Sequence, residues 1–524
     1  MLEYTVPVAA FAVCLLLVHK YIIYPALLSP LAKIPAGHWS AHVSPLWILY
    51  LRWTSQENRT VHRLHLKYGP AIRLAPNLLS FNCFEGGLKQ IYLGGFPKTE
   101  FYWNGFANYG KHNIFTFEDN AMHASRKRLI SNTFSKSYVM SSQAARAATR
   151  EVLFRRLLPL LDQHASAGKP LEMLEMNYSY SMDSFVHWQF GRSAASDLIR
   201  NPKERRMYLD GFFAIAPYTF WQYHFPALAT WLSKFGVHLI PKKVFTLVEN
   251  IEKWNAEKCD KAYALLSSSE QLSDENSPVV FAQALKTMNS PTAHTEKDQA
   301  YPMRKEIMSD MFAHNSAAHE TSGNTLTYAM WELSRRPDVQ EKLRQELLGL
   351  SPSLSFTRGS STDGEVHLPE PKDVASLPYL EGVVMESLRV YPAVPGGQPR
   401  RVPKLSSLGG HDNIPAGTVV QCYAYALHRN PDVFPDPEAW KPERWIESSP
   451  EQLASMRRWF WAFGSGGRMC IGSNFANYSM KYALAAIYTN FRTEIYDHGD
   501  MELQDSYLAG PKGHRLELKF HHVS

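Results

Sequence analysis

The first 28 residues carry the longest apolar stretch of the chain. Val6 to Val18 contains no charged residue, and Tyr21 to Leu28 continues the stretch after Lys20. A membrane span needs about 20 apolar residues, so this segment predicts an anchor whose Lys20 ammonium reaches the interface. No positively charged residue precedes the apolar core, and no small-residue cleavage site follows it. Both features favour a retained anchor over a cleaved signal peptide, and a buried N-terminal helix is the alternative. Lys33 follows the apolar core and Glu3 precedes it, which predicts that the body faces the cytosol.

The body, residues 29–524, has a mostly helical pattern and is expected to form one domain. Helical character extends over residues 304–350 with a break at Arg336 and Pro337, over 377–390, and from just after Cys470 to about Phe491. Short extended pieces such as 418–424 lie in the Pro- and Gly-rich stretch between the last two helices. The polar stretches 267–278 and 351–371 predict surface loops. The expected fold class is therefore mostly α, with small β-sheets.

Composition and charge argue against several classes of protein. The net charge of the chain is +6, and no run of Lys and Arg resembles a nucleic-acid-binding tail, so we expect no nucleic-acid partner. The five cysteines are odd in number and have no C-x-x-C spacing, which argues against a disulfide framework or a zinc ribbon. Mostly reduced thiols fit a cytosol-facing protein.

The segment from Phe463 to Gly472 has the pattern F-x-x-G-x-R-x-C-x-G, with five fixed positions. A cysteine thiolate is a strongly electron-donating iron ligand that favours O–O cleavage. Backbone N–H groups of a glycine-rich loop can hydrogen-bond the sulfur, and the helix expected after Cys470 points its positive end toward it, which lowers the thiol pKa. The alternative is a buried free cysteine in a Gly-rich turn.

This loop resembles the cysteine-ligand signature of the cytochrome P450 family. The resemblance implies haem b as the cofactor, with Cys470 as the axial ligand of the iron and Arg468 paired with a haem propionate. Phe463, Gly466 and Gly472 belong to the same cofactor-binding loop, and Gly472 lets the following helix approach the ring. The resemblance also implies a fold in which the haem lies between an oxygen-activating helix and the cysteine-loop helix.

A second motif lies where the resemblance requires it. Glu386 and Arg389 form E-x-x-R on one helical face, and Arg444 follows within the segment 442–445. The resemblance implies that these three residues form a buried structural triad that fixes the cysteine loop. The same pattern at residues 341–344 is interpreted as a solvated helix face.

The segment from Ala317 to Ser322 matches the family's oxygen-activating motif. An acidic side chain beside a hydroxyl suits a proton relay to bound oxygen, which makes Glu320 and Thr321 the candidate catalytic residues. Ala318 stands where the family usually has Gly, which leaves the width of the oxygen groove open.

Three further residues are candidates for binding the haem propionates. His123 and Lys127 share a helical face and stand where the family has the Trp and Arg of W-x-x-x-R. The arginines within 126–128 are rivals, and a solvated basic face is the alternative. Arg400 resembles the later strand residue that binds the other propionate, with Arg401 as its rival.

The resemblance implies a monooxygenase that inserts one oxygen atom from O2 into a small molecule. The chain has no flavin or nicotinamide fingerprint, so an NADPH-cytochrome P450 reductase is the expected electron donor. Residues 126–128, 457 and 458 are the candidate docking patch, with a generic basic surface as the alternative. The aromatic-rich stretches 101–117 and 212–225 predict a bulky apolar or aromatic substrate, although membrane contact and core packing explain the second stretch equally well.

The expected location is the endoplasmic reticulum membrane, with a single span, and the chain resembles fungal enzymes of secondary metabolism. Oxidative phenol coupling by the same haem species is one alternative activity. A reductase-independent haem-thiolate isomerase or dehydratase is another, against which Glu320 and Thr321 argue. A non-catalytic haem-binding protein is the third alternative.

Overall fold

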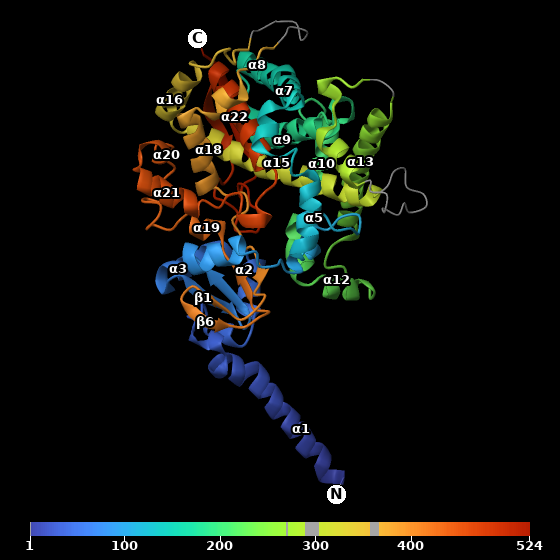
Figure 1. The fold of residues 1–524 in the computed structure, drawn as a ribbon, viewed down its shortest axis with the longest axis vertical. Coiled ribbons are helices and arrows are strands. Elements are labelled where there is room, and N and C mark those ends of the chain that lie inside the picture. Colours follow the sequence, from blue (N-terminus) through green and yellow to red (C-terminus); the bar gives the residue numbers. More distant parts are fainter. Residues whose placement is uncertain (1, 269–270, 289–302, 357–365, 524) are drawn as a thin grey trace.

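Two long helices lie at the centre of the molecule, α9 (Met173–Phe190) and α15 (Arg304–Ser334), and they pack along each other (Figure 1). The computed structural model describes residues 2–268, 271–288, 303–356 and 366–523. Helices α18 (Pro378–Val390) and α22 (Ser473–Asn490) pack against α15 from the C-terminal half of the chain. Nearly every residue of α9 is buried, because the helix is enclosed by its neighbours on all sides.

The helix bounds agree with the sequence pattern in its main features. The break near Pro337 is confirmed, since α15 ends at Ser334 and α16 (Pro337–Leu347) begins with the proline, a residue suited to the first turn. The helix predicted after Cys470 is α22. The extended piece at 418–424 is shorter than predicted, because β7 ends at Gln421 and α19 (Ala424–Leu427) begins at Ala424. Further helices named below are α4 (Phe101–Phe106), α5 (Asn120–Ile130), α10 (Pro202–Phe213), α11 (Thr219–His224), α12 (Pro226–Ser233) and α13 (Lys242–Ser267).

The β-sheets are small and lie beside the helical core. The largest described sheet has the order β1 (Ala71–Ala75), β2 (Leu78–Phe81), β7 (Val419–Gln421), β4 (Arg400–Arg401). β2 and β7 are parallel, and the other two pairs are antiparallel. β3 (Leu171–Glu172), β9 (Leu516–His522) and β8 (Phe491–His498) form a second sheet, and β5 (Ser406–Leu408) pairs with β6 (His411–Ile414). The predicted fold class, mostly α with small sheets, is confirmed.

The N-terminal segment projects away from the body as α1 (Leu2–Val18), continued by a π-helix over His19–Leu28 (Figure 1). Val6–Leu28 is apolar and, at 23 residues, long enough to cross a membrane, and none of its apolar window is buried. The base of this segment is bound to the body. The buried Arg73 of β1 donates from Nη1 to the Pro25 carbonyl at 2.8 Å and from Nη2 to the Pro76 carbonyl at 2.7 Å.

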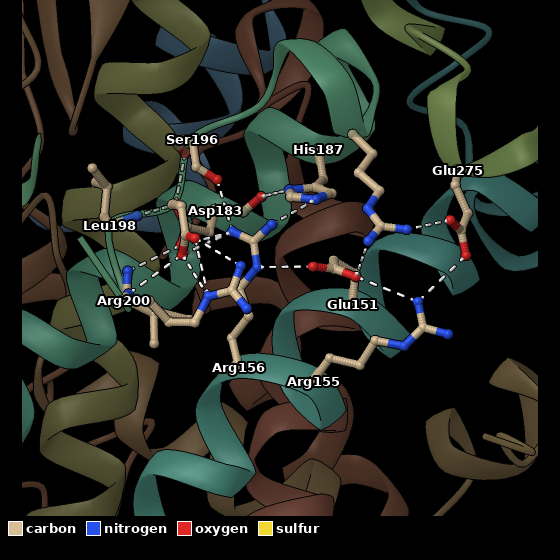
Figure 2. A network of polar contacts seen from close by, with 12 residues as sticks. Glu151, Arg155, Arg156, Asp183, His187, Ser196, Leu198, Arg200 and Glu275 are labelled. Carbon is tan, nitrogen blue, oxygen red and sulfur yellow. Dashed lines mark hydrogen bonds and ion pairs between the residues drawn. The ribbon is translucent and has the colours of Figure 1, made fainter. Parts of the chain in front are cut away.

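A buried network of charges fastens the end of α9 to its surroundings (Figure 2). Arg156 lies 3.1 Å from Glu151 and 3.5 Å from Asp183, and donates to the Ser196 carbonyl at 2.8 Å. Asp183 in turn accepts from the Ser196 hydroxyl at 2.6 Å and from the Leu198 N–H at 2.9 Å. Burial raises the pKa of Asp183 to about 6 against the opposing effect of Arg156. Because every charge in this network has partners, it holds the segment after α9 in place.

Candidate active site: the cysteine loop and the cavity above it

The cysteine loop folds tightly between Phe463 and the start of α22. The Cys470 N–H donates to the Phe463 carbonyl at 2.9 Å, which closes the loop. Gly466 adopts φ +67°, and a Cβ at this position would lie 2.4 Å from the Tyr92 carbonyl oxygen. Only glycine therefore fits here without displacing backbone. Gly472, the residue before α22, would place a Cβ 4.0 Å from the Cys470 sulfur.

The Cys470 thiol is enclosed by protein but is accessible from a large cavity. Burial raises its pKa above the ordinary value, while N–H groups of Gly472 and Ser473 and the Lys127 ammonium act in the opposite direction. The prediction of a lowered pKa was therefore wrong for the protein chain taken alone. Helix-end donors do face the sulfur as expected, but the desolvation of an enclosed thiolate outweighs them.

The cavity has a volume of about 1630 Å³, and its walls come from segments far apart in the sequence. Phe463, Arg468, Cys470 and Gly472 line it on one side. The α15 residues that line it are Phe312, Ala313, His314, Ser316, Ala317, Ala318, Glu320, Thr321, Ser322 and Thr325. The cysteine loop and the predicted oxygen-activating segment thus open into one space.

Glu320 and Thr321 both line this cavity from α15. The Thr321 hydroxyl donates to the Ala317 carbonyl at 2.7 Å, one helical turn earlier. Burial raises the pKa of Glu320 to about 7. Within the described part of the chain, its carboxyl group has no hydrogen-bond or ion-pair partner. α15 continues through Ala318 as an unbroken α-helix, so the usual Gly at this position is not required for the helix to line the cavity.

Aromatic side chains from both predicted aromatic stretches line the cavity. Tyr223 of α11 stacks on Phe106 of α4 with ring centroids 5.6 Å apart, and Phe115 contacts Phe106 edge-on at 5.0 Å. Gly105 permits this contact, since a Cβ there would lie 2.5 Å from the Tyr223 ring. The aromatic wall, as we call this group, consists of Phe101, Phe106, Phe115, Phe212, Phe213 and Tyr223.

Three of the predicted propionate-binding residues line the same cavity, namely His123, Lys127 and Arg468, and the fourth, Arg400, directly follows the lining residue Pro399. Arg400 is buried, whereas its rival Arg401 points to the surface and pairs with Glu100 at 2.7 Å. Burial, together with neighbouring cations, lowers the pKa of His123 to about 3, so its ring is neutral and can donate one N–H.

Arg468 and Lys127 also bind backbone carbonyl groups near the loop. Arg468 donates to the Phe117 carbonyl at 2.7 Å and to the Glu118 carbonyl at 3.0 Å, which joins the cysteine loop to the start of α5. The Lys127 ammonium donates to the Gly467 carbonyl at 3.0 Å.

Sequence reasoning missed Lys98, which lines the cavity and is 5% exposed. No motif spacing marks this residue. It reaches the site only because its backbone forms an isolated antiparallel bridge with Arg400, about 300 residues later in the chain. A cavity with a cysteine thiol on one side and several buried cations at its edge fits a flat iron macrocycle that carries two carboxylates.

The three charged residues predicted to form a structural triad are brought together. Arg389 binds Glu386 through two contacts, of 2.7 and 2.8 Å, and Arg444 lies 3.2 Å from the same carboxylate. Trp445 and the backbone N–H of Lys441 donate to Glu386 at 2.9 and 3.0 Å. Glu386 and Arg389 are fully buried. The carboxylate of Glu386 therefore has a donor on every side.

His428, which sequence reasoning also missed, connects this triad to the cysteine loop. Arg389 donates to the His428 carbonyl at 3.0 Å, and the His428 ring bonds the Arg389 carbonyl through Nδ1 at 3.0 Å. Its Nε2 accepts the backbone N–H of Trp461 at 2.8 Å, two residues before Phe463. A neutral ring with a proton on Nδ1 satisfies both contacts.

We expect acid to destabilise the protein partly through His428. Burial and Arg389 lower its pKa from 6.5 to about 3 in the folded state. The stabilisation that the neutral His428 ring provides is therefore complete above pH 6.5 and is lost as the pH falls toward 3. The reason is that this histidine binds a proton more readily in the unfolded chain than in the folded protein. In a His428→Gln variant, which keeps one donor and one acceptor, the free energy of unfolding should fall less steeply with decreasing pH than in the wild type. The two slopes should differ by about 1.4 kcal/mol per pH unit. Urea unfolding at several pH values measures this, and equal slopes for both proteins would contradict it.

The predicted basic docking patch needs a correction. Arg126 has a side chain only 10% exposed, and its Nε lies 3.4 Å from the buried Asp310 carboxylate. Arg126 therefore fastens α5 to α15 instead of facing a partner, and Asp310 also accepts the Ile114 N–H of the preceding segment at 2.8 Å. Arg128, Arg457 and Arg458 are exposed.

Comparison with known proteins agrees with this geometry. The cytochrome P450 family model matches residues 46–518. A tryprostatin B 6-hydroxylase of Neosartorya fischeri is 26% identical over 93% of this chain and 82% of its own length. A pisatin demethylase of Fusarium vanettenii is 26% identical over 95% of this chain and 90% of its own length. The cytochrome P450 monooxygenase FGM1 of Gibberella zeae is 25% identical over 92% of this chain and 91% of its own length. The resemblance to fungal secondary-metabolism members is confirmed, and the chain belongs to the cytochrome P450 family of monooxygenases.

Proposed function

We propose that this chain is a membrane-anchored haem-thiolate monooxygenase that inserts one oxygen atom from O2 into a bulky apolar or aromatic small molecule. The second oxygen atom leaves as water, with two electrons from NADPH delivered by a cytochrome P450 reductase and two protons from solvent. One observation supports this proposal above the others. Cys470, the Glu320–Thr321 face of α15 and the aromatic wall line a single cavity.

Each residue group has a defined task in this proposal. Cys470 would be the thiolate ligand of haem b, with its sulfur held by N–H groups of Gly472 and Ser473. Haem, when bound, supplies the oxygen activation and the electron transfer. With a pKa raised to about 7, the Glu320 carboxyl is present in both protonation states near neutral pH, so it can take up a proton and pass it on. The aromatic wall would exclude water and hold an apolar substrate by ring contacts.

The proposal is tested with purified protein in two steps. The reduced, carbon-monoxide difference spectrum should show a Soret band at about 450 nm, and a band at about 420 nm, or none, in carefully handled protein would refute the thiolate assignment. Turnover with reductase, NADPH and isotopically labelled O2 should then place one labelled atom in the product. A coupled dimer without label would instead indicate oxidative phenol coupling, and turnover of an organic peroxide without NADPH would indicate an isomerase or dehydratase.

Replacing Thr321 with alanine should uncouple NADPH consumption from product formation. The variant loses the hydroxyl beside Glu320, and proton-transfer groups contribute at least about 100-fold to rates, so we expect product per NADPH to fall by about 10-fold or more. Peroxide release measured beside product gives the coupling ratio. Thr321→Ser, which keeps the hydroxyl, is the matched control and should retain most of the coupling. Unchanged coupling in Thr321→Ala would remove Thr321 from the relay.

Deleting residues 2–24 should move the protein from membranes to the soluble fraction. The deletion removes most of the apolar segment but keeps Pro25, whose carbonyl accepts from Arg73. Ultracentrifugation of lysates that express the full chain or the deletion measures this. Retention on membranes would point to α12, which lies at the end of the body from which α1 projects and exposes Leu228 and Trp231 (Figure 1). We assign the anchor to the endoplasmic reticulum, with residues 29–524 facing the cytosol.

A further inference from the structure

Glu252 of α13 is a carboxylate that lines the cavity without a cationic partner. The cavity has five described carboxylates, and three of them pair with arginines: Glu57 with Arg52, Glu100 with Arg401, and Asp505 with Arg59. The fourth, Glu320, is assigned to proton transfer by the proposed function. Within the part of the chain that the structure describes, Glu252 forms no ion pair, and burial, followed by the charge of Glu249, raises its pKa. A cation in the cavity would offset the cost of burying this carboxylate.

The carboxylate of Glu252 is held in place next to a second acceptor. Its Oε1 accepts the Tyr109 N–H at 3.0 Å, and the Tyr109 hydroxyl donates to the Glu252 carbonyl. Asn108, the residue before Tyr109, also lines the cavity and is 8% exposed. Its amide nitrogen faces the Phe106 carbonyl, which can only accept, and its Oδ1 has no partner among the described residues. Two acceptor groups, one of them charged, therefore lie beside the peptide unit that joins Asn108 to Tyr109, and neither has a side-chain donor.

A carboxylate next to an amide oxygen is suited to a protonated amine. An ammonium group supplies positive charge and an N–H donor together, whereas a hydroxyl supplies a donor without charge. Aromatic rings nearby favour a cation as well, since the Tyr109 ring packs edge-on against the cavity residue Phe312 with centroids 6.1 Å apart. Among the described residues, no three acidic, histidine or cysteine side chains are grouped so that they could hold a metal ion. The chemistry of this corner therefore favours an organic cation.

We propose that Glu252 and Asn108 bind a protonated amine of the substrate, so that the substrate class is an aromatic compound with a basic nitrogen. This inference rests on the proposed function and narrows it. The aromatic wall holds the rings of such a compound, and Glu252 selects those that carry a positive charge.

The packing of α13 sets the distance between this amine and the oxygen-activating segment. Asn255 lies one turn after Glu252 on α13. It donates to the Met308 carbonyl at 3.1 Å and accepts from Asn315 at 2.9 Å, which fixes it beside that part of α15. The middle of this part lies about 14 Å before Thr321 along the helix, at about 1.5 Å per residue. We therefore expect oxidation at a carbon remote from the nitrogen and no removal of groups bound to the nitrogen.

The test uses the haem-loaded, full-length enzyme and three probes of similar length. They are biphenylbutyl-dimethylamine, a cation at neutral pH, biphenylbutanol, which is neutral, and biphenylpentanoate, an anion. Titration of the ferric enzyme, followed by the shift of its Soret band, gives the three dissociation constants. Because a hydrogen bond to a charged group is stronger than one between neutral groups, the amine should bind about 10- to 100-fold more tightly than the alcohol, and the carboxylate most weakly. Coordination of the probe nitrogen by the iron, seen as a Soret shift to longer wavelength, would overturn the proposal.

Three variants test whether the preference comes from these residues. Glu252→Gln keeps an acceptor for the Tyr109 N–H but removes the charge, so it should abolish the preference for the amine over the alcohol. Asn108→Leu removes the second acceptor and should weaken binding of the amine by up to about 10-fold. Glu249→Gln is the matched control, because Glu249 is exposed and does not line the cavity, and the preference should stay unchanged. A preference that survives in Glu252→Gln would overturn the assignment.

The outcomes separate this inference from the proposed function. A wild type without the band at about 450 nm would refute the proposed function itself. A wild type that has this band but binds the amine and the alcohol equally, or binds neither, would overturn only the amine site. If Glu252→Gln does not load haem, the ranking of the three probes on the wild type decides. Turnover of the amine probe should hydroxylate the biphenyl group, and formaldehyde released from its dimethylamino group would overturn the placement of the nitrogen.

Discussion

Replacing Cys470 with alanine is expected to abolish the carbon-monoxide band at about 450 nm and all NADPH-dependent product formation. The thiol is the sulfur at the base of the cavity, and its surroundings are arranged around it: the loop closed by the Phe463 carbonyl, the N–H groups at the start of α22, and the Lys127 ammonium. Alanine leaves this shape intact but removes the sulfur that would donate electron density to the iron. The loss should therefore be complete and not graded.

Cys83→Ala is the matched control, because Cys83 is half-buried and does not line the cavity. It should keep both the spectrum and the activity. Circular dichroism of Cys470→Ala should match that of the wild type, which separates loss of the ligand from loss of the fold. A retained band at about 450 nm in Cys470→Ala would require another thiolate ligand and would overturn the assignment.

Replacing Arg389 with alanine should leave little folded, haem-loaded protein. The change strands the fully buried Glu386 carboxylate and removes the donor to the carbonyls of His428, Pro437 and Ala439. Breaking a buried ion pair costs about 3–5 kcal/mol, a large part of the about 5–15 kcal/mol that stabilises a typical domain. The cysteine loop should suffer with it, since His428 bonds the Trp461 N–H at its start. Soluble yield and haem content per chain measure both effects.

Two variants sharpen this prediction. Arg344→Ala removes the arginine of the second E-x-x-R pattern, on the half-exposed α16, and should cost much less. The double variant Glu386→Gln, Arg389→Met should be more stable than Arg389→Ala, because it removes the stranded Glu386 charge while Arg444 keeps the Pro435 and Asp436 carbonyls as acceptors. Normal haem content in Arg389→Ala would show that the triad does not support the loop.

Most of the correct predictions about the candidate site came from motifs and from their order along the chain. Phe463 to Gly472 is one continuous loop, so its geometry depends on residues close together in sequence, and Gly466 could be recognised from its place in that loop. The E-x-x-R helix and the Ala317–Ser322 segment likewise lie within single helices. Local patterns of this kind predict which side chains are neighbours in the folded protein, because residues on one helix have fixed relative positions.

What could not be predicted depends on contacts between distant segments. Lys98 enters the site through its bridge with Arg400, and His428 connects Arg389 to Trp461 without any spacing that marks it. Arg126 was misassigned to the surface because a basic helix gives no sign of the buried Asp310 that binds it. The thiol pKa was misjudged for a related reason. Burial is a property of the whole fold, and it outweighed the local helix-end effect that the sequence could indicate.

The hydrogen bond from Arg73 to the Pro25 carbonyl ties the base of the N-terminal helix to β1. A membrane span adjusts its tilt to the thickness of the bilayer, leaning more in thin membranes and less in thick ones. Because the base of the helix is bound to β1, a change in its tilt within a bilayer would turn the body and would raise or lower α12 relative to the membrane. Bilayer thickness would thus set how deeply the neighbourhood of the aromatic wall meets the membrane in which an apolar substrate dissolves.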